Sequence, residues 1–156
     1  KGADVVFAAA GGTGIGVYQA AKDAGKLAIG VDSNQNHLQP GTMLTSMVKR
    51  VDVAVYNISK ATKPGAVTVL GLKEGGVDYA MDANNAKLVS ADMKAKVDAA
   101  RAGLKDGSFH PWKGPVVGQD GKNVVEKDVT PDDKFMLGIN FYVKGVDGKV
   151  PSGDKK

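Results

Sequence analysis

Cysteine is missing altogether from the 156 residues of the chain. Its absence excludes disulfides, thiolate metal sites and a lipid-modified cysteine within these residues, and it leaves the compartment open, because cytoplasm and periplasm both suit such a chain. No apolar run approaches the roughly 20 residues that span a bilayer, and the chain does not open on a basic segment followed by an apolar one. The sequence therefore predicts no membrane-spanning helix and no signal segment within these residues.

Clustered basic charge is also missing, although the formal net charge is +4. The lysines mostly alternate with acids, as in Lys22-Asp23, and the adjacent basic pairs are Lys49-Arg50 and Lys155-Lys156. A nucleic-acid-binding surface gathers Lys and Arg on one element with aromatic residues between them. The charge pattern argues against nucleic acid as a partner.

Histidine is scarce, and the two histidines, His37 and His110, stand far apart in loop-like segments. Neither has a carboxylate at metal-ligand spacing, and no serine sits in a nucleophile elbow. The sequence therefore predicts no metal site, no catalytic residue and no hydrolase. We interpret Trp112, the single tryptophan, as a rim or core anchor, with a stacking platform as the alternative.

What is present is the composition of an ordinary globular α/β protein. Hydrophobic residues make up 42% and charged residues 24%, with 21 glycines and 6 prolines. A chain of this size holds one compact domain with a core, or a piece of a larger one. Because Lys1-Gly2-Ala3-Asp4 leads directly into an apolar run, we expect a fragment or a processed product of a longer protein.

Strand and helix patterns alternate over the first sixty residues. Continuous apolar runs predict strands buried on both faces of a parallel sheet, and apolar residues at helical spacing predict helices between them. Gly25 is expected as a C-cap, and a right-handed crossover brings the strand ends to one edge. The expected strands are 4–9, 27–31 and 43–48, and the expected helices are 14–24 and a second one from Val51, which Pro64-Gly65 stops.

The second half of the chain begins with a fourth expected strand at 67–70, a glycine turn at 73–76 and a short run at 77–80. The clearest helix is 91–104, with Ser90 as its N-cap and an apolar face at helical spacing. Loops dominate from Phe109 onward, with a turn at 119–122 between two brief extended runs. A helix start is expected at 130–133, where Thr130 caps and Pro131 takes the first position.

A glycine-rich turn at residues 11–16 lies between a predicted strand and a predicted helix, where backbone amides can bind an anion or a polar ligand. A nicotinamide cofactor is one alternative, but the fingerprint G-x-G-x-x-G fails at its third glycine, where Val17 or Gln19 stands. Asp32 does lie where a ribose-binding acid belongs. A purely structural turn is the remaining interpretation.

Tyr56 and Lys60 have the spacing that short-chain dehydrogenases use for proton transfer. In that family a full doubly wound domain separates the glycine turn from the tyrosine, whereas here only one strand and a loop intervene. We interpret the two residues as a pair on a helix surface. An NAD(P)-binding Rossmann oxidoreductase of the short-chain type stays as the alternative function.

Polar residues follow the ends of the predicted strands. Gly11, Gly12 and Thr13 come after the first strand, the segment 32–35 after the second, and Lys73 after the fourth. Ligands bind at the carboxyl ends of parallel strands. A carboxylate accepts hydrogen bonds from vicinal hydroxyls and a lysine donates while balancing its charge, which suits a ribose. A turn aspartate with a solvated lysine is an equal alternative.

Five blocks of the sequence resemble, in order and spacing, successive blocks of the basic membrane protein family of ABC-transporter substrate-binding proteins. They are residues 2–7, 10–17, 29–35, 44–49 and 71–77, and together they cover about half of the chain. The predicted helix 91–104 also fits the last long helix of the family. The match is more specific than any single glycine motif.

The resemblance implies a type I periplasmic-binding-protein fold, with Rossmann-like parallel sheets and flanking helices in two hinged lobes. Known members bind purine nucleosides such as adenosine, guanosine or inosine and deliver them to an ABC permease, with no enzymatic activity and no cofactor. Carried over by position, Asp32 and Lys73 hold the ribose or base, and Gly11, Gly12 and Thr13 line the cleft. Phe7 is a candidate for stacking on the purine and reads equally well as core.

Family members are considerably longer than this chain. The resemblance implies that residues 1–70 form the later part of the second lobe, 71–108 a crossing strand and the long helix, 109–150 a return segment with a C-terminal extension, and 151–156 a tail. Segments before Lys1 would supply the first lobe and the opening strands of the second. The family works in the periplasm or at the cell surface, where a lipid anchor is one form. A fragment that binds nothing alone is a third alternative.

Overall fold

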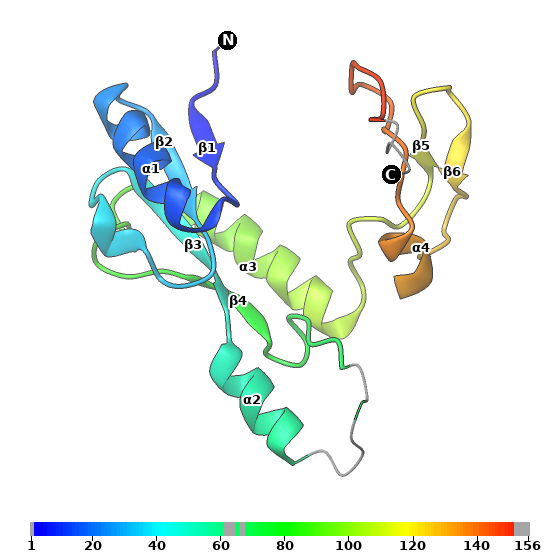
Figure 1. Cartoon of the computed structure of the whole chain (residues 1–156), viewed down its shortest axis with the longest axis horizontal. Helices are drawn as coiled ribbons and strands as arrows, with labels where there is room; N and C mark the ends of the chain where they lie inside the picture. The colour runs from blue at the N-terminus through cyan, green and yellow to red at the C-terminus, as the bar shows by residue number, and fades with distance from the viewer. Residues whose placement is uncertain (1, 61–64, 66–67, 152–156) are drawn as a thin grey trace. The chain divides into compact units, whose positions relative to one another are not determined.

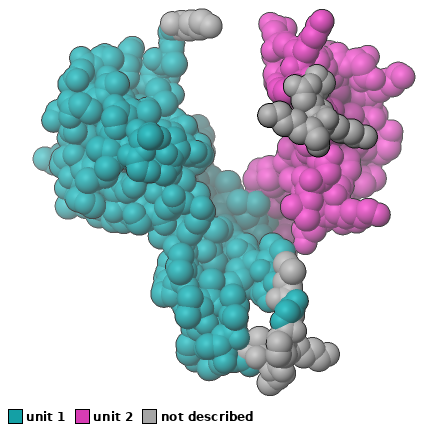
Figure 2. All heavy atoms as spheres, viewed as in Figure 1, with its two compact units in different colours: residues 1–105 teal, residues 106–156 magenta. Residues whose placement is uncertain are grey.

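The computed structural model describes residues 2–60, 65 and 68–151. The chain divides into two compact units, residues 1–105 and residues 106–156 (Figure 1, Figure 2). Unit 1 contains a mixed α/β layer structure, and unit 2 is smaller. Each unit is described by itself below.

Four strands form the sheet of unit 1, in the spatial order β1-β2-β3-β4. The strands β1, β2 and β3 run parallel, as the apolar runs predicted, and β4 runs antiparallel to β3. The bounds are Val5–Phe7 for β1, Leu27–Gly30 for β2, Met43–Lys49 for β3 and Val77–Ala80 for β4. The fold is therefore α/β with a parallel sheet and one antiparallel edge strand.

Three α-helices accompany this sheet within the described part of unit 1, α1 at Gly14–Asp23, α2 at Val51–Ser59 and α3 at Ala91–Asp106. Short 3-10 turns occur at Gly11–Thr13 and Asn36–Leu38. After α1 the chain turns at Gly25 with a φ of 62°, a conformation that glycine adopts without steric cost. Ser90 caps α3, because its Oγ accepts from the amide of Met93 at 3.2 Å. Among the described residues no helix is long and apolar enough to cross a membrane.

One face of the sheet packs against α1 and holds the core. Tyr18 and Ala21 of α1 meet Ala28 of β2 and Met43 of β3, and Ala8 closes the cluster next to β1. Tyr18, Ala28 and Met43 are fully buried.

The helix predicted at 14–24 is present, but its expected apolar face is only partly in the core. Of that face Ala21 is buried and Val17 partly buried, whereas Ala20 and Ala24 are exposed. Tyr18, one helical turn before Ala21, takes their place in the core.

The other face of the sheet carries α3, and a hollow of about 280 Å³ lies between them. Alternation along β2 sends Ile29 to this face, opposite Ala28. The walls of the hollow are mainly apolar and come from β2, β3, β4, the following loop and α3: Ile29, Leu44, Thr45, Tyr79, Met81, Val89, Met93, Lys94 and Val97. The side chains of α3 therefore leave part of the space between the helix and the sheet unfilled.

Helix α2 follows β3 directly and extends beyond its end (Figure 1). Its apolar residues Val51, Val55 and Ile58 recur at helical spacing as predicted, yet each is about 60% exposed, at 63%, 61% and 60%. The apolar pattern therefore predicted the helix correctly, but the apolar side chains that define the pattern are not buried.

Two sequence predictions are wrong. Residues 68–70 form no strand, and Val67 lies outside the described residues. The edge position beside β3 is taken instead by 77–80. Helix α4, Asp133–Leu137, is capped by Asp132 rather than Thr130. Asp132 has extended backbone and its carboxylate accepts from the amide of Phe135 at 2.8 Å, the geometry of an N-cap.

Unit 2 is built on a hairpin and a small aromatic cluster. The strands β5, Val116–Val117, and β6, Asn123–Val125, pair antiparallel around the turn predicted at 119–122. Trp112 packs edge-on against Phe141 with ring centroids 6.5 Å apart, and Phe135 lies 6.1 Å from Phe141 on another side. Trp112 is therefore an anchor that joins the beginning of the unit to its later part.

Candidate ligand site at the strand ends

The parallel strands β1, β2 and β3 end at one edge of the sheet. The turn Gly11–Thr13 comes shortly after β1, and Asp32 comes shortly after β2. Lys73 reaches the same edge for a different reason than predicted. Lys73 precedes β4. Because β4 is antiparallel to β3, the first residue of β4, Val77, pairs with Lys49 at the end of β3.

Asp32 is the central residue of this edge. Its carboxylate binds Lys49, with Nζ 2.6 Å from Oδ1, while both side chains stay about half exposed. The same two residues are also joined through the backbone, because the amide of Lys49 donates to the carbonyl of Asp32 at 2.9 Å. Asp32 has a φ of 71°, which is uncommon for a residue with a side chain and is concentrated at functional positions.

A part-buried hydrogen-bond network holds the loop after β2 in place. The hydroxyl of Tyr18 donates to Gln35 Oε1 at 2.7 Å, and the same oxygen accepts from the amide of Val31 at 3.2 Å. The amide of Gln35 donates to Ser46 Oγ at 3.0 Å, and Ser46 donates onward to Asn36 at 2.8 Å. Burial raises the pKa of the Tyr18 hydroxyl, which therefore stays a neutral donor.

The same loop is tied to the segment after β4. Asn34 and Asn36 both donate to the carboxylate of Asp82, at 2.9 Å and 3.2 Å, and Asn85 donates to the carbonyl of Leu44 at 2.9 Å. Of the predicted polar segment 32–35, Asn34 and Gln35 are thus engaged within the protein. Asp32 is the charged group of that segment that faces outward.

Lys73 lies in the turn Gly71–Gly76, and its side chain is exposed. The turn is closed by the amide of Gly76 donating to Gly71 at 2.9 Å, and it is joined to the end of β3 because the amide of Arg50 donates to Gly76 at 2.8 Å. The structure pairs Asp32 with Lys49 rather than Lys73. Sequence reasoning missed Lys49, although the block 44–49 that contains it was among the segments of resemblance.

The turn Gly11–Thr13 is exposed and forms a 3-10 helix that leads into α1. Gly11 has a φ of 53°, and a Cβ at Gly11 or Gly12 would meet nothing within 4 Å. The first turn of α1 contains no acidic residue. The turn is therefore open on the side where a Cβ of Gly11 or Gly12 would stand, while the amide of Gly14 donates back to the carbonyls of Gly11 and Gly12.

Tyr56 and Lys60 lie on the exposed surface of α2 and bind each other. Lys60 Nζ donates to the Tyr56 hydroxyl and also lies 4.1 Å from the centre of the Tyr56 ring. This geometry confirms the interpretation of a helix-surface pair. Within the described residues no group of three or more His, Cys, Asp or Glu side chains could hold a metal ion.

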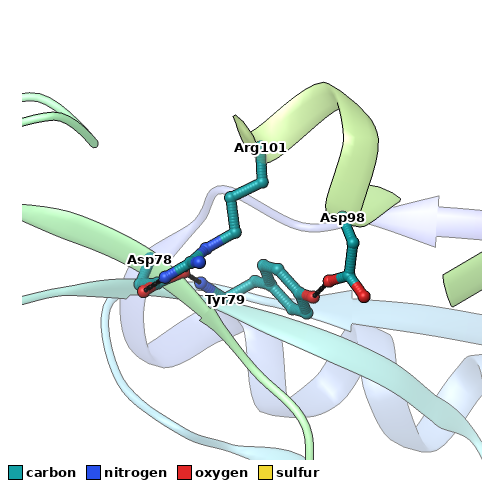
Figure 3. Close-up of polar contacts among 4 residues, drawn as sticks. All are labelled: Asp78, Tyr79, Asp98 and Arg101. Atoms are coloured by element: carbon teal, nitrogen blue, oxygen red, sulfur yellow. Dashed lines mark hydrogen bonds and ion pairs between the residues drawn. The ribbon is translucent and has the colours of Figure 1, made fainter. Parts of the chain in front are cut away.

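A second polar cluster fixes α3 to β4 (Figure 3). Arg101 binds Asp78 through two hydrogen bonds of 3.0 and 2.5 Å, and the Tyr79 hydroxyl donates to Asp98 at 2.8 Å. The Arg101 guanidinium lowers the pKa of Asp78, and the bond to Asp98 raises the pKa of Tyr79. These contacts lie beside the hollow under α3 and serve to position the helix.

Comparison with known proteins follows the division into units. The family described as "ABC transporter substrate-binding protein PnrA-like" (Bmp) matches residues 1–105, which is the whole of unit 1. A purine-binding protein of Brucella abortus is 34% identical over 137 residues, 85% of this chain and 38% of its own length. A match of that extent also includes part of unit 2.

Two further likenesses agree with this match. Basic membrane protein D of Borreliella burgdorferi is 41% identical over 91 residues, 53% of this chain and 27% of its own length. The crystal structure of an ABC-transporter solute-binding protein from Aeropyrum pernix has a TM-score of 0.58, with 22% identity over 87% of this chain and 43% of that one. The chain therefore spans less than half of the length of each of these proteins.

Proposed function

The chain belongs to the PnrA-like family of ABC-transporter substrate-binding proteins, and from this premise we propose that it is part of a receptor for purine nucleosides. The observation that carries the proposal is the carboxylate and ammonium pair of Asp32 and Lys49 at the strand-end edge. The name of the Brucella relative supports a purine-containing ligand.

The chemistry of the pair suits a ribose. A carboxylate accepts two hydrogen bonds from vicinal hydroxyls, and an ammonium group donates to a sugar oxygen while it balances the charge of the acid. Because both side chains are about half exposed, the ligand can reach them without breaking a buried contact. Gly11, Gly12 and Thr13 would contact the ligand at the same edge of the sheet, and Lys73 would approach from the neighbouring turn.

The proposal extends to partners and location. The receptor would close over its ligand by hinge motion and dock on an ABC permease outside the cytoplasm, held near the membrane by a lipid anchor where one is present. It would act by binding and release, without catalysis and without a cofactor. The alternative of an NAD(P)-dependent oxidoreductase is not favoured, because the family that matches residues 1–105 is one of transport substrate-binding proteins.

The ligand class is tested by calorimetry and thermal shift on the protein in its full natural length. Adenosine, guanosine or inosine should raise the melting temperature and release heat on binding, whereas NAD and NADP should do neither. A shift with nicotinamide cofactors and none with nucleosides would contradict the proposal. Since binding to the native state stabilises by mass action, about 2.7 kcal/mol is expected at a ligand concentration one hundred times Kd.

The residues are tested by substitutions that keep shape and remove charge. Asp32→Asn is preferred to alanine because asparagine tolerates a positive φ. Asp32→Asn and Lys49→Gln should each weaken nucleoside binding by about 1–3 kcal/mol through lost hydrogen bonds to a polar ligand, and Lys73→Gln shows whether that lysine also binds. The control is Lys96→Gln on the exposed surface of α3. Unchanged affinity in both Asp32→Asn and Lys49→Gln would remove the pair from the site, even if nucleosides bind.

A further inference from the structure

The side-chain amide of Gln35 is held at its oxygen end. The oxygen, Oε1, accepts from the Tyr18 hydroxyl at 2.7 Å and from the backbone amide of Val31 at 3.2 Å. Because a backbone N–H can only donate, the amide of Val31 fixes which end of the Gln35 side chain is the oxygen. The two N–H groups of the side-chain nitrogen, Nε2, therefore lie at the opposite end and can only donate.

No residue in the part of the chain that the structure describes accepts a hydrogen bond from Gln35 Nε2. The Nε2 atoms of Gln19, Gln39 and Gln119 each donate to a neighbouring oxygen, at 2.7, 2.7 and 2.8 Å. Gln35 is partly buried, and every buried side-chain nitrogen or oxygen of the described residues has a partner. Its Nε2 therefore reaches solvent. A donor that is fixed in orientation and open to solvent suits a polar ligand group.

Gln35 lies close to Asp32, the carboxylate of the proposed ligand site. Val31, whose amide donates to Gln35, immediately precedes Asp32 in the chain. Burial raises the pKa of the Tyr18 hydroxyl, and the charge of Asp32 also raises it. The carboxylate thus lies within electrostatic reach of the hydroxyl that holds Gln35. One edge of the sheet therefore carries an acceptor and, beside it, a donor that cannot turn round.

We infer that Gln35 is a further ligand-binding residue, which selects ribose over deoxyribose because one sugar hydroxyl donates to Asp32 while its oxygen accepts from Gln35 Nε2. This inference rests on the proposed function. A hydroxyl has one proton to donate and lone pairs with which to accept, so it satisfies both groups at once. A hydrogen atom in its place leaves both groups unpaired, and sites built to bind a hydroxyl discriminate strongly against ligands that lack it.

The test measures the preference for ribose by calorimetry on the protein of full natural length. The probes are whichever of adenosine, guanosine or inosine binds most tightly, together with its 2′-deoxy and 3′-deoxy forms. Gln35→Glu keeps an oxygen for Tyr18 and Val31 but replaces the donor by a second acceptor. Two carboxylates cannot share one hydroxyl proton. The variant should therefore bind the ribonucleoside about tenfold more weakly, and its preference over at least one deoxy form should fall by about fivefold or more.

Two control variants separate a ligand contact from a structural role. Tyr18→Phe removes one of the two donors that hold Oε1 and leaves Nε2 in place, so any loss of affinity should be equal for the ribonucleoside and both deoxy forms. Gln39→Glu makes the same chemical change at an exposed bond to Gln19. Because exposed charges contribute little, it should change affinity and preference by less than about twofold.

Nuclear magnetic resonance of the unsubstituted protein gives a measurement that does not depend on how the variants fold. In protein labelled with ¹⁵N at glutamine, the two Nε2 protons of Gln35 are assigned through its backbone amide. Their resonances should shift with saturating ribonucleoside, because a hydrogen bond forms, and should shift less with one of the two deoxy forms.

Three results would overturn the inference while the receptor proposal stands. One is a preference in Gln35→Glu equal to that of the unsubstituted protein, and another is Nε2 protons that do not respond to saturating ribonucleoside. The third is an equal fall in preference in Tyr18→Phe, because the position of the loop would then set the preference. If the unsubstituted protein bound none of the nucleosides, both proposals would fail together.

Discussion

The two faces of the sheet in unit 1 are built differently. On the α1 side, Tyr18, Ala28 and Met43 are fully buried, and the helix and strands meet through apolar side chains. On the α3 side, Met93 and Val97 are each 45% exposed, and the helix is fixed to β4 mainly by polar contacts of Arg101 and Tyr79. The α1 face is a packed core, whereas on the α3 face a hollow lies between the helix and the sheet.

The difference shows where stability and function are supported. The packed face also contains the network of Tyr18, Gln35 and Ser46 that fixes the loop carrying Asp32. The position of the candidate ligand site thus depends on the α1 side. The α3 side contributes little burial, because Met93 and Val97 stay 45% exposed. Substitutions on the two sides should therefore differ in cost in this chain.

The largest effect is expected on the packed face. Met43→Ala should lower the free energy of unfolding by about 2–5 kcal/mol, because Met43 is fully buried and its removal leaves a cavity in a core that relaxes only in part. Urea unfolding followed by circular dichroism at 222 nm measures the change. A loss below about 1 kcal/mol would show that this face is not the core.

A smaller loss is expected at Gly30, where the packed face meets the network. A Cβ added there would lie 2.6 Å from Ser46 Oγ and 3.1 Å from Gln35 Oε1. Gly30→Ala should therefore cost about 1–3 kcal/mol through overpacking and displaced hydrogen bonds. Gly16→Ala in α1 is the control, since nothing lies within 4 Å of its added Cβ, and alanine should stabilise the helix by up to about 1 kcal/mol. Equal effects at both glycines would contradict the packing described here.

The ion pair on the α3 side should contribute less and should depend on pH. The pKa of Asp78 is lowered by its hydrogen bonds to Arg101. An acid with a lowered folded pKa adds stability above its unfolded pKa of about 4, and this stability is lost as the pH falls through the lower folded value. With both side chains about one third exposed, Asp78→Asn should cost about 1–2 kcal/mol at pH 7 and progressively less as the pH falls below about 4.

The control for this prediction is a fully solvated pair on the same helix. Asp92 binds Lys96 at 2.9 Å, with the two side chains 74% and 76% exposed. Asp92→Asn should change the free energy of unfolding by less than about 0.5 kcal/mol at pH 7. Thermal or urea unfolding of both variants at pH 7 and at a series of pH values below about 4 measures the difference. A cost for Asp78→Asn that does not decrease anywhere in that series would mean that charge pairing is not its cause.

The parallel strands and the helices of unit 1 could be predicted from periodicity, because each was a local pattern of apolar residues. The antiparallel edge strand could not, because 67–70 and 77–80 are both short apolar runs and only pairing with β3 decides between them. The N-cap of α4 was misplaced for a similar reason. Thr130 and Asp132 are both residue types that cap helices. Asp132 is the cap because its backbone is extended and its side chain accepts from the amide of Phe135.

The candidate ligand site, too, could be predicted only in part from the sequence. Asp32 could be located from its place after a strand, since that depends on local order. Its partner could not, because Lys49 and Lys73 both come to the edge of the sheet and only the backbone bond from Lys49 to Asp32 selects the first. Asn34 and Gln35 looked equally available to a ligand, but their partners are far along the chain, at Asp82 and Tyr18.

The smallest effect sharpens the contrast between the faces, because it uses the same substitution as the largest. Met93→Ala removes a side chain that is 45% exposed, against 0% for Met43. About half of the transfer free energy of a methionine is at stake, the hollow beside it is already empty, and alanine is the better helix former. The cost in this chain should therefore stay below about 1 kcal/mol by urea unfolding. A cost as large as that of Met43→Ala would contradict the exposure of Met93 described here.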